Sequence, residues 1–463
     1  MKSSRYNYFF DAGGGRRGVF NTFTGALSVL TPEEEAFLKN YSGRETDFDI
    51  EPFVQMGYII QDDIDEKAIV DFDRNYYSLN NRAVFRILTT TYCNASCYYC
   101  YEAGAPLVHM TLKTAEDVCR FIIERTKPGE LIKVEWFGGE PLLNQEAIDY
   151  ITSRLSGNDF SVVYTMASNG LLFTPDVVCK AKNTWNLERV QITIDGLEER
   201  FNEIKKAPGI ENPFRRVCKS IRLLSEAGIA VSVRIHYNDN KDELLRLIEY
   251  FAASFSDCRN IFYYFHPLYK NEMSVARDIV ADLAELNEAL VRNGLSSFDE
   301  IYGFTYKLGR CFATRHNSFT IAPDGRLYNC SHNLDDGNVV GSVSDFNIYN
   351  AKRLKFQNPA LSEACADCVF LPICQGGCRA AELKIATMRQ CFLFKEGIEL
   401  ALRQLIKEVT IMITIKEPNT HQAIKNGSLQ SNESKVIIPV SDLTTCHPDD
   451  CWDCDNCGGP KTH

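Results

Sequence analysis

Three cysteines lie close together at Cys93, Cys97 and Cys100, in the run Thr-Tyr-Cys-Asn-Ala-Ser-Cys-Tyr-Tyr-Cys-Tyr. A cubane iron–sulfur cluster is normally held by four thiolates, so a loop that supplies three leaves one iron open to a small molecule. The alternative is a zinc ion, but a structural zinc site needs four closed ligands, and no nearby His or Cys provides the fourth. We therefore expect an iron–sulfur cluster whose open iron is the reactive centre.

The spacing of these cysteines, with Tyr99 before the last of them, resembles the signature of the radical S-adenosylmethionine (SAM) enzymes. In that family the open iron chelates the amino and carboxylate groups of SAM. The resemblance implies an oxidoreductase that splits SAM to a 5'-deoxyadenosyl radical, which then abstracts hydrogen from an unactivated C–H bond. It also implies that the three cysteines are catalytic cluster ligands and that Tyr99 lies at the cofactor.

Several polar and glycine residues that follow predicted strands match the SAM pocket of the same family. A Gly-Gly-Glu-Pro run resembles the motif that binds the SAM amino group, and two glycines let a backbone approach a ligand closely. Strand-end polar residues match family contacts to the ribose and carboxylate, and one arginine aligns with a partner of the carboxylate. Each could instead be an ordinary strand-end or helix-surface residue. The set is Gly138, Gly139, Glu140, Ser168, Asn169, Thr193 and Arg216.

The elements that must position these residues alternate between strand and helix patterns from about residue 81 to residue 300. Such alternation favours a parallel sheet wrapped by helices, an α/β fold. The resemblance implies the partial (β/α)6 barrel of radical SAM enzymes, with the cofactor at the carboxyl ends of the strands. The predicted strands are 84–89, 132–137, 162–167, 190–194, 231–237 and 261–266, and two of the predicted helices are 214–227 and 242–254.

Residues 1–80 have a different pattern, with three short strands and a few short helices. Thr31-Pro32-Glu33-Glu34 predicts a helix start with a capping box. The order of elements resembles the winged-helix-like recognition domain (a PqqD-like recognition element) that precedes the catalytic domain in many maturases of ribosomally made peptides. Such domains bind a leader peptide as an extra strand at a sheet edge. The alternative is a module that only packs on the barrel.

A second group of cysteines occupies residues 301–411, and its gaps resemble the SPASM extension of radical SAM enzymes. The resemblance implies two auxiliary iron–sulfur clusters, so that the protein would hold three 4Fe–4S clusters in all. One auxiliary cluster would take four cysteines: Cys365, Cys368, Cys374 and Cys391. The other would take Cys311, Cys330 and Cys378. The second set lacks a fourth cysteine, so its remaining iron would bind a substrate thiolate, water or another side chain.

Residues 412–463 begin with Met and end in a run rich in Cys and Asp, so they resemble a precursor peptide joined to its own maturase. The segment 436–440 is a candidate strand for the recognition domain. The sulfur donors would be Cys446, Cys451, Cys454 and Cys457. Their short gaps are also compatible with a further metal site, and a featureless tail is the third alternative.

Composition excludes other classes of function. The net charge of −11 offers no basic surface for nucleic acid or an anionic membrane. No apolar run is long enough for a signal sequence or a membrane span, which favours a cytoplasmic enzyme. In that reducing compartment we expect 18 cysteines to be ligands or reacting groups rather than disulfides, apart from four that we expect to be buried thiols. These four are Cys119, Cys179, Cys218 and Cys258.

Together these patterns predict a radical SAM maturase that forms thioether crosslinks, of the sactipeptide or ranthipeptide type, in a cysteine-rich precursor peptide. We expect a reductant such as flavodoxin or ferredoxin as a second partner. A carbon–carbon crosslinking maturase that acts at Trp452 is an alternative of the same class. A multi-cluster electron-transfer protein, with the tail as a further metal site, is an alternative of a different class.

Overall fold

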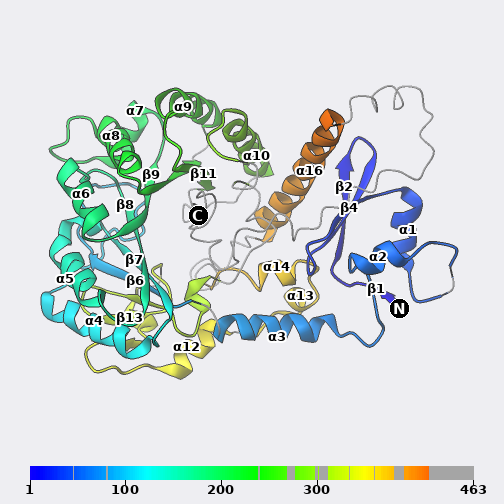
Figure 1. The fold of residues 1–463 in the computed structure, drawn as a ribbon, viewed down its shortest axis with the longest axis horizontal. Helices are drawn as coiled ribbons and strands as arrows, with labels where there is room; N and C mark the ends of the chain where they lie inside the picture. The colour runs from blue at the N-terminus through cyan, green and yellow to red at the C-terminus, as the bar shows by residue number, and fades with distance from the viewer. Residues whose placement is uncertain are drawn as a thin grey trace.

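The computed structural model describes residues 1–44, 46–79, 82–237, 240–267, 277–297, 301, 311–332, 334–358, 360–379 and 391–416. Figure 1 shows a curved sheet flanked by helices, with a smaller N-terminal module beside it. The four cysteines of the predicted precursor-like segment, Cys446, Cys451, Cys454 and Cys457, lie outside the described residues.

The six strands predicted for the catalytic part are confirmed, and neighbours in sequence pair in parallel. Each strand contributes buried apolar side chains to the core, although polar residues such as Lys133 in β7 and Glu188 and Gln191 in β9 interrupt the apolar runs. Because every strand runs the same way, their carboxyl ends meet at one edge of the sheet. The strands are β6 (Val84–Thr90), β7 (Leu131–Gly138), β8 (Ser161–Ser168), β9 (Leu187–Ile194), β10 (Ala230–Tyr237) and β11 (Ile261–Pro267).

Helices between these strands lie along the outer side of the curved sheet (Figure 1). Their apolar faces and the strands form one large core, which includes Trp136, Ile192 and Val233. The helices predicted over 214–227 and 242–254 are confirmed as α8 and α9. The helices are α4 (Leu112–Arg125), η1 (Pro141–Asn144), α5 (Gln145–Leu155), α6 (Pro175–Asn183), α7 (Glu198–Lys205), α8 (Pro213–Glu226), α9 (Lys241–Ser254) and α10 (Arg277–Arg292).

A three-strand extension continues the sheet beyond β6. Strand β12 pairs with β6 in parallel, and β13 and β14 add antiparallel, so the order is β11-β10-β9-β8-β7-β6-β12-β13-β14. The extension therefore places the segment after Cys311 directly beside the first strand of the catalytic sheet. Its elements are η2 (Phe312–Thr314), β12 (Phe319–Ile321), β13 (Arg326–Tyr328), η3 (Asp336–Asn338), β14 (Gly341–Ser342) and α12 (Asn350–Gln357).

The N-terminal module has its own antiparallel sheet, in the order β2-β3-β4, and a short β1–β5 pair. The predicted capping box is confirmed, since the Thr31 hydroxyl accepts from the Glu34 amide and the Glu34 carboxylate accepts from the Thr31 amide. Helix α3 is not predicted from the sequence. The elements are β1 (Lys2–Ser3), β2 (Asn7–Gly13), β3 (Arg16–Asn21), β4 (Leu27–Leu30), α1 (Pro32–Asn40), α2 (Glu51–Gln55), β5 (Ile59–Ile60) and α3 (Glu66–Leu79).

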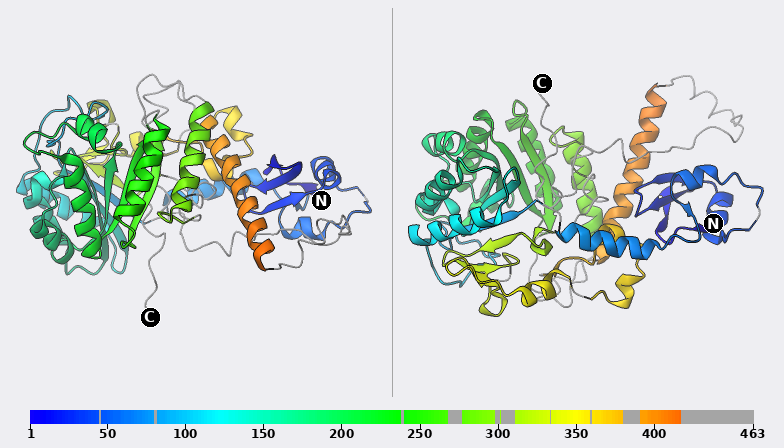
Figure 2. Two further views of the ribbon diagram at one scale, coloured as in Figure 1. Left: turned by 90° about the horizontal axis from the view of Figure 1, so that it is seen from above. Right: turned by 60° about the horizontal axis from the view of Figure 1, so that its bottom comes forward.

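The module packs against the second cysteine array through α13 (Glu363–Ala366), α14 (Leu371–Cys374) and α16 (Cys391–Lys416). The Tyr8 and Phe370 rings lie 4.6 Å apart, and one apolar cluster joins β2, β3 and β4 to α14 and α16. Helix α16 runs to Lys416 and so passes the predicted domain boundary after residue 411. Figure 2 shows α16 between the module and α10. Within the described stretches, neither α16 nor another helix is long and apolar enough to cross a membrane.

Candidate active site

The cysteine loop follows the carboxyl end of β6. Cys93 and Cys100 are exposed and Cys97 is half-buried. The loop is tied to the fold by the Ser96 amide, which donates to the Lys205 carbonyl at 2.9 Å. In the part of the chain that the structure describes, no three Cys, His, Asp or Glu side chains are already drawn together as a metal site. The donor set, three thiols on one short loop, still fits a cluster with one open iron.

The two glycines after β7 explain how the cysteine loop reaches its place. A Cβ atom at Gly138 would collide with the carbonyl oxygen of Thr90, and one at Gly139 would collide with that of Tyr92. Gly138 also has a φ of 123°, which other residues rarely adopt. The close approach that these glycines permit is therefore to the protein's own backbone at the start of the loop.

Glu140 is fully buried, and its carboxylate is held by the protein itself. It accepts from the Ser168 hydroxyl at 2.9 and 3.0 Å and from the backbone amide of Asn169 at 2.8 Å. Burial raises the pKa of Glu140 to about 7, although these hydrogen bonds act in the opposite direction and lower the pKa. Glu140 thus joins the ends of β7 and β8, and the predicted contact of its motif with the SAM amino group stays a prediction.

Asn169 connects this hydrogen-bonded group to the cysteine loop. Its side-chain amide donates to the Asn94 side-chain oxygen at 2.7 Å and lies 3.6 Å from the Cys93 sulfur. Arg216 lies nearby, because its Nε donates to the carbonyl of Leu171 at 3.0 Å. The structure therefore gathers most of the residues predicted from motifs at the carboxyl ends of β7 and β8.

A buried charged network lies on the other side of the loop, and sequence reasoning misses most of it. The Lys205 ammonium lies 3.2 Å from Asp195 and donates to the Thr193 hydroxyl at 2.9 Å. The Tyr99 hydroxyl donates to Asp195 at 2.7 Å, and His236 Nδ1 lies 2.7 Å from the same oxygen. The Lys205 and Asp195 side chains are only 2% and 1% exposed.

The charges of this network are fixed by one another. Burial disfavours ionisation of Asp195, but Lys205 and the His236 hydrogen bond hold the pKa of that carboxyl below its ordinary value. Burial lowers the pKa of His236, which favours the neutral ring, and a neutral ring in this position donates from Nδ1 to the ionised Asp195. The electrostatic influence of Lys205 also reaches Cys97. A positive charge therefore lies beside the central thiol of the loop.

A second group of thiols lies next to the loop. Burial raises the pKa of Cys311 to about 12, and the charges of the Cys330 and Cys378 thiols also raise it, so both thiols lie within electrostatic reach of Cys311. The Tyr101 and His332 rings stack at 4.6 Å, and the His332 amide donates to the Cys330 sulfur at 3.5 Å. Ring stacking thus joins the residue after Cys100 to the segment after Cys330.

The predicted ligands of the other auxiliary cluster lie against the N-terminal module. Cys365 is in α13, Cys368 follows it, and Cys374 ends α14; all three are half-buried. Arg5 pairs with Asp367 at 3.0 Å, between the first two of these cysteines. Cys391 begins α16, but its side chain is outside the description. The grouping of these four as ligands therefore stays a prediction.

The prediction of four buried free cysteines is confirmed for two and wrong for one. Cys119 and Cys218 are buried in the core of the sheet and its helices. Cys258 is half-buried. Cys179 is exposed on α6, where its sulfur accepts from the Asn183 side chain at 3.3 Å.

Comparisons of sequence agree with this geometry. Residues 87–251 match the model of the radical SAM superfamily. Mycofactocin maturase MftC from Mycobacterium tuberculosis is 25% identical over 321 residues, which cover 63% of this chain and 76% of MftC. GTP 3',8-cyclase from Clostridium perfringens is 27% identical over 267 residues, which cover 53% of this chain and 80% of the cyclase.

Solved structures share the fold. The structure of anSMEcpe with bound AdoMet has a TM-score of 0.57 at 18% identity, over 71% of this chain and 98% of that chain. Streptococcus suis SuiB bound to S-adenosylmethionine has a TM-score of 0.50 at 16% identity, over 83% of this chain and 97% of SuiB. From the matched residues and the α/β fold with its parallel sheet, we conclude that this chain contains a radical SAM domain.

Proposed function

We propose that this protein is a radical SAM peptide maturase that forms thioether crosslinks between cysteine sulfurs and carbon atoms of a ribosomally made precursor peptide. The observation that carries the proposal is the stacking of the Tyr101 and His332 rings, which joins the segment after Cys100 to the segment after Cys330. This contact places a second thiol-rich site beside the site expected to start radical chemistry.

Cys93, Cys97 and Cys100 would hold the SAM-binding cluster. When bound, that cluster and SAM supply a 5'-deoxyadenosyl radical that removes a hydrogen atom from carbon. The chain's own residues orient the loop: Asn169 fixes its first cysteine, and Tyr99 and Lys205 fix its centre. The electron that starts the reaction would come from a reductant such as flavodoxin or ferredoxin.

Cys311, Cys330 and Cys378 would hold the first auxiliary cluster. A metal-bound thiol is deprotonated, so a cluster with an open position there supplies both a site for a substrate thiolate and an acceptor for the electron released when the S–C bond forms. His332, beside Cys330, is the candidate side chain for closing that position in the absence of substrate.

The peptide substrate is supported by the N-terminal module and by the names of relatives. MftC is named a maturase, and one anSMEcpe structure is described with a bound peptide. Helix α16 lies beside strand β2 of the module. Arg403 in α16 donates to the carbonyl of Asp11 in β2 at 2.7 Å. Within the described residues no strand pairs with the outer edge of β4, Leu27–Leu30. We infer that β4 is the edge to which a leader strand adds.

The experiment that tests the proposal uses the segment 412–463 as substrate. The enzyme is reconstituted anaerobically and reduced with SAM, and this segment is then fragmented by mass spectrometry. We expect it to become lighter by H2 for each crosslink, with loss of thiols that react with iodoacetamide. An unchanged mass would contradict the segment's role as substrate. A lighter segment whose thiols all still react would instead indicate a carbon–carbon crosslink.

Replacement of Cys311 by Ala separates SAM cleavage from crosslink formation. We expect 5'-deoxyadenosine formation to stay within about threefold of the wild type while crosslinked product falls more than about tenfold, since the change affects only the second half of the reaction. Both products are measured in the same reaction. Cys258→Ala, at a half-buried cysteine outside both groups, is the control. Full crosslinking by the Cys311 variant would exclude a role for this site.

A further inference from the structure

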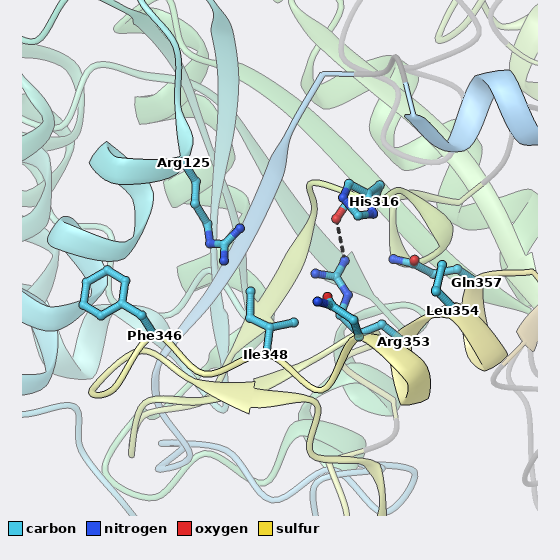
Figure 3. Close-up of a pocket in the computed structure, with 8 residues that line it drawn as sticks. Arg125, His316, Phe346, Ile348, Arg353, Leu354 and Gln357 are labelled. Carbon is cyan, nitrogen blue, oxygen red and sulfur yellow. Dashed lines mark hydrogen bonds between the residues drawn. The ribbon is translucent and has the colours of Figure 1, made fainter.

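A cavity of about 600 Å³ lies at the opposite end of the strands from the cysteine loop. Arg125 ends α4, just before β7 begins, and His316 precedes β12, so the cavity opens near the amino ends of these strands. Its volume falls within the range of small-molecule sites, roughly 300–1,000 Å³. The lining residues are Arg125, His316, Phe346, Ile348, Asn350, Arg353, Leu354 and Gln357 (Figure 3).

Arg353 is a buried cation with unused hydrogen-bonding capacity. It is 3% exposed, and its Nη2 atom donates to the carbonyl oxygens of Arg315, His316 and Ser318 at 3.2, 2.8 and 3.1 Å. Its Nε is buried without a hydrogen-bond partner. A buried donor that is left unpaired is costly, so a ligand that accepts from it gains affinity.

Arg125 provides a second guanidinium on the facing side of the cavity. The guanidinium carbons of Arg125 and Arg353 lie 5.6 and 3.8 Å from the centre of the same Phe319 ring. Figure 3 shows both guanidinium groups directed into the space above Ile348, with His316 at its side. Two planar guanidinium groups near one point are suited to an oxyanion with several oxygens.

No described carboxylate neutralises these groups. Arg125, Arg353 and His316 form no ion pair with an Asp or Glu among the residues that the structure describes, although the charge of the adjacent Glu124 reaches Arg125. Burial lowers the pKa of Arg353 to about 9, and the charge of the nearby Arg125 is the second cause of this shift. Burial and both arginines lower the pKa of His316. The cavity thus concentrates positive charge, and no carboxylate of the described residues pairs with it.

Apolar side chains complete the wall and limit the kind of ligand. Phe346, Ile348 and Leu354 line the cavity, and the Leu354 side chain is 56% exposed. The Phe346 ring also lies under the Arg120 guanidinium, whose carbon is 5.0 Å from the ring centre. A free phosphate would leave these side chains uncovered.

We propose that this cavity binds a small phosphate monoester, with the phosphate at Arg125 and Arg353 and an apolar body against Phe346, Ile348 and Leu354. A dianionic phosphate matches two guanidinium groups better than a single carboxylate does. This site goes beyond the proposed maturase function, and it lies away from the SAM pocket.

Calorimetric titration of the cluster-loaded protein with phenyl phosphate, inorganic phosphate and phenol tests the proposal. We expect phenyl phosphate to bind at one site, tighter than inorganic phosphate, and phenol not to bind; saturating SAM should not change the result. Absence of phenyl phosphate binding would overturn the proposal. Equal binding of the two phosphates would overturn the assignment of an ester and leave free phosphate as the ligand.

Two variants locate the binding. Arg125→Ala should lower the affinity for phenyl phosphate by roughly tenfold or more, since it removes a charged hydrogen-bond donor. Lys127→Ala removes the same charge from an exposed residue outside the cavity and should change affinity by less than about twofold. Leu354→Asp places a carboxylate at the exposed rim and should also weaken binding roughly tenfold. Equal affinities in the Arg125 and Lys127 variants would contradict the site.

Discussion

Replacement of Cys97 by Ala is expected to abolish both 5'-deoxyadenosine and crosslinked peptide. Cys97 is the central thiol of the cysteine loop, and a loop with two thiolates cannot hold a cubane cluster in place. Loss of an outer hydrogen-bond partner of a metal ligand costs about 10–100-fold in affinity or activity, and loss of the ligand itself should cost more. The measurements are iron content, the absorbance of the reconstituted protein and 5'-deoxyadenosine formation under reducing conditions.

The matched control is Cys179→Ala, because Cys179 is exposed on α6 and belongs to neither group of cysteines. This variant should keep wild-type iron content and SAM cleavage. The Cys97 variant should retain the iron of the second array, so that total iron falls in part rather than to zero. Crosslinked peptide from the Cys97 variant would contradict the assignment of this loop as the start of the reaction.

The catalytic sheet could be predicted because its strands are short apolar runs between helical patterns. The run 132–137 is buried at every position but its last, so local composition and tertiary burial agree there, while β9 has alternating buried positions at Val190, Ile192 and Ile194. Helix α3 could not be predicted in this way. Among the side chains of α3 that the structure describes, up to residue 76, Val70 is the one apolar residue that is fully buried, while Ile69 and Phe72 are 39% and 65% exposed. Two charged residues, Glu66 and Arg74, are buried at helical spacing on the same face as Val70, so an apolar period does not mark this face in the sequence.

In the candidate site, too, some residues could be predicted from the sequence and others could not. Residues in contiguous motifs, such as Cys93 and Glu140, are recognisable because their spacing is local. Asp195, Lys205 and His236 come from three different elements, and only the packing of α7 and β10 brings them together. Asp195 had one sequence signal, its place directly after a buried strand, but Lys205 is one of many charged residues in α7. A buried ion pair of this kind depends on long-range contacts that no local pattern contains.

Replacement of Lys205 by Met is expected to destabilise the protein by about 3–5 kcal/mol, because it leaves the Asp195 carboxylate buried without its cation. Tyr99 and His236 still donate to Asp195, but neither carries a positive charge. The cysteine loop should also loosen, since Lys205 bonds to Tyr99. Urea denaturation of the cluster-free protein measures the first effect, and iron uptake on reconstitution measures the second.

Two further variants separate loss of the charge pair from loss of packing. In Lys205→Met combined with Asp195→Asn no unpaired charge remains, so much of the stability should return, as expected for two residues that interact directly. Arg215→Met breaks the exposed pair with Glu198, which lies at 3.1 Å, and should cost less than about 1 kcal/mol. If the double variant is as unstable as Lys205→Met alone, the ammonium is needed for more than Asp195, and its remaining partners are Thr193 and Tyr99 on the strand and loop that hold the cysteines.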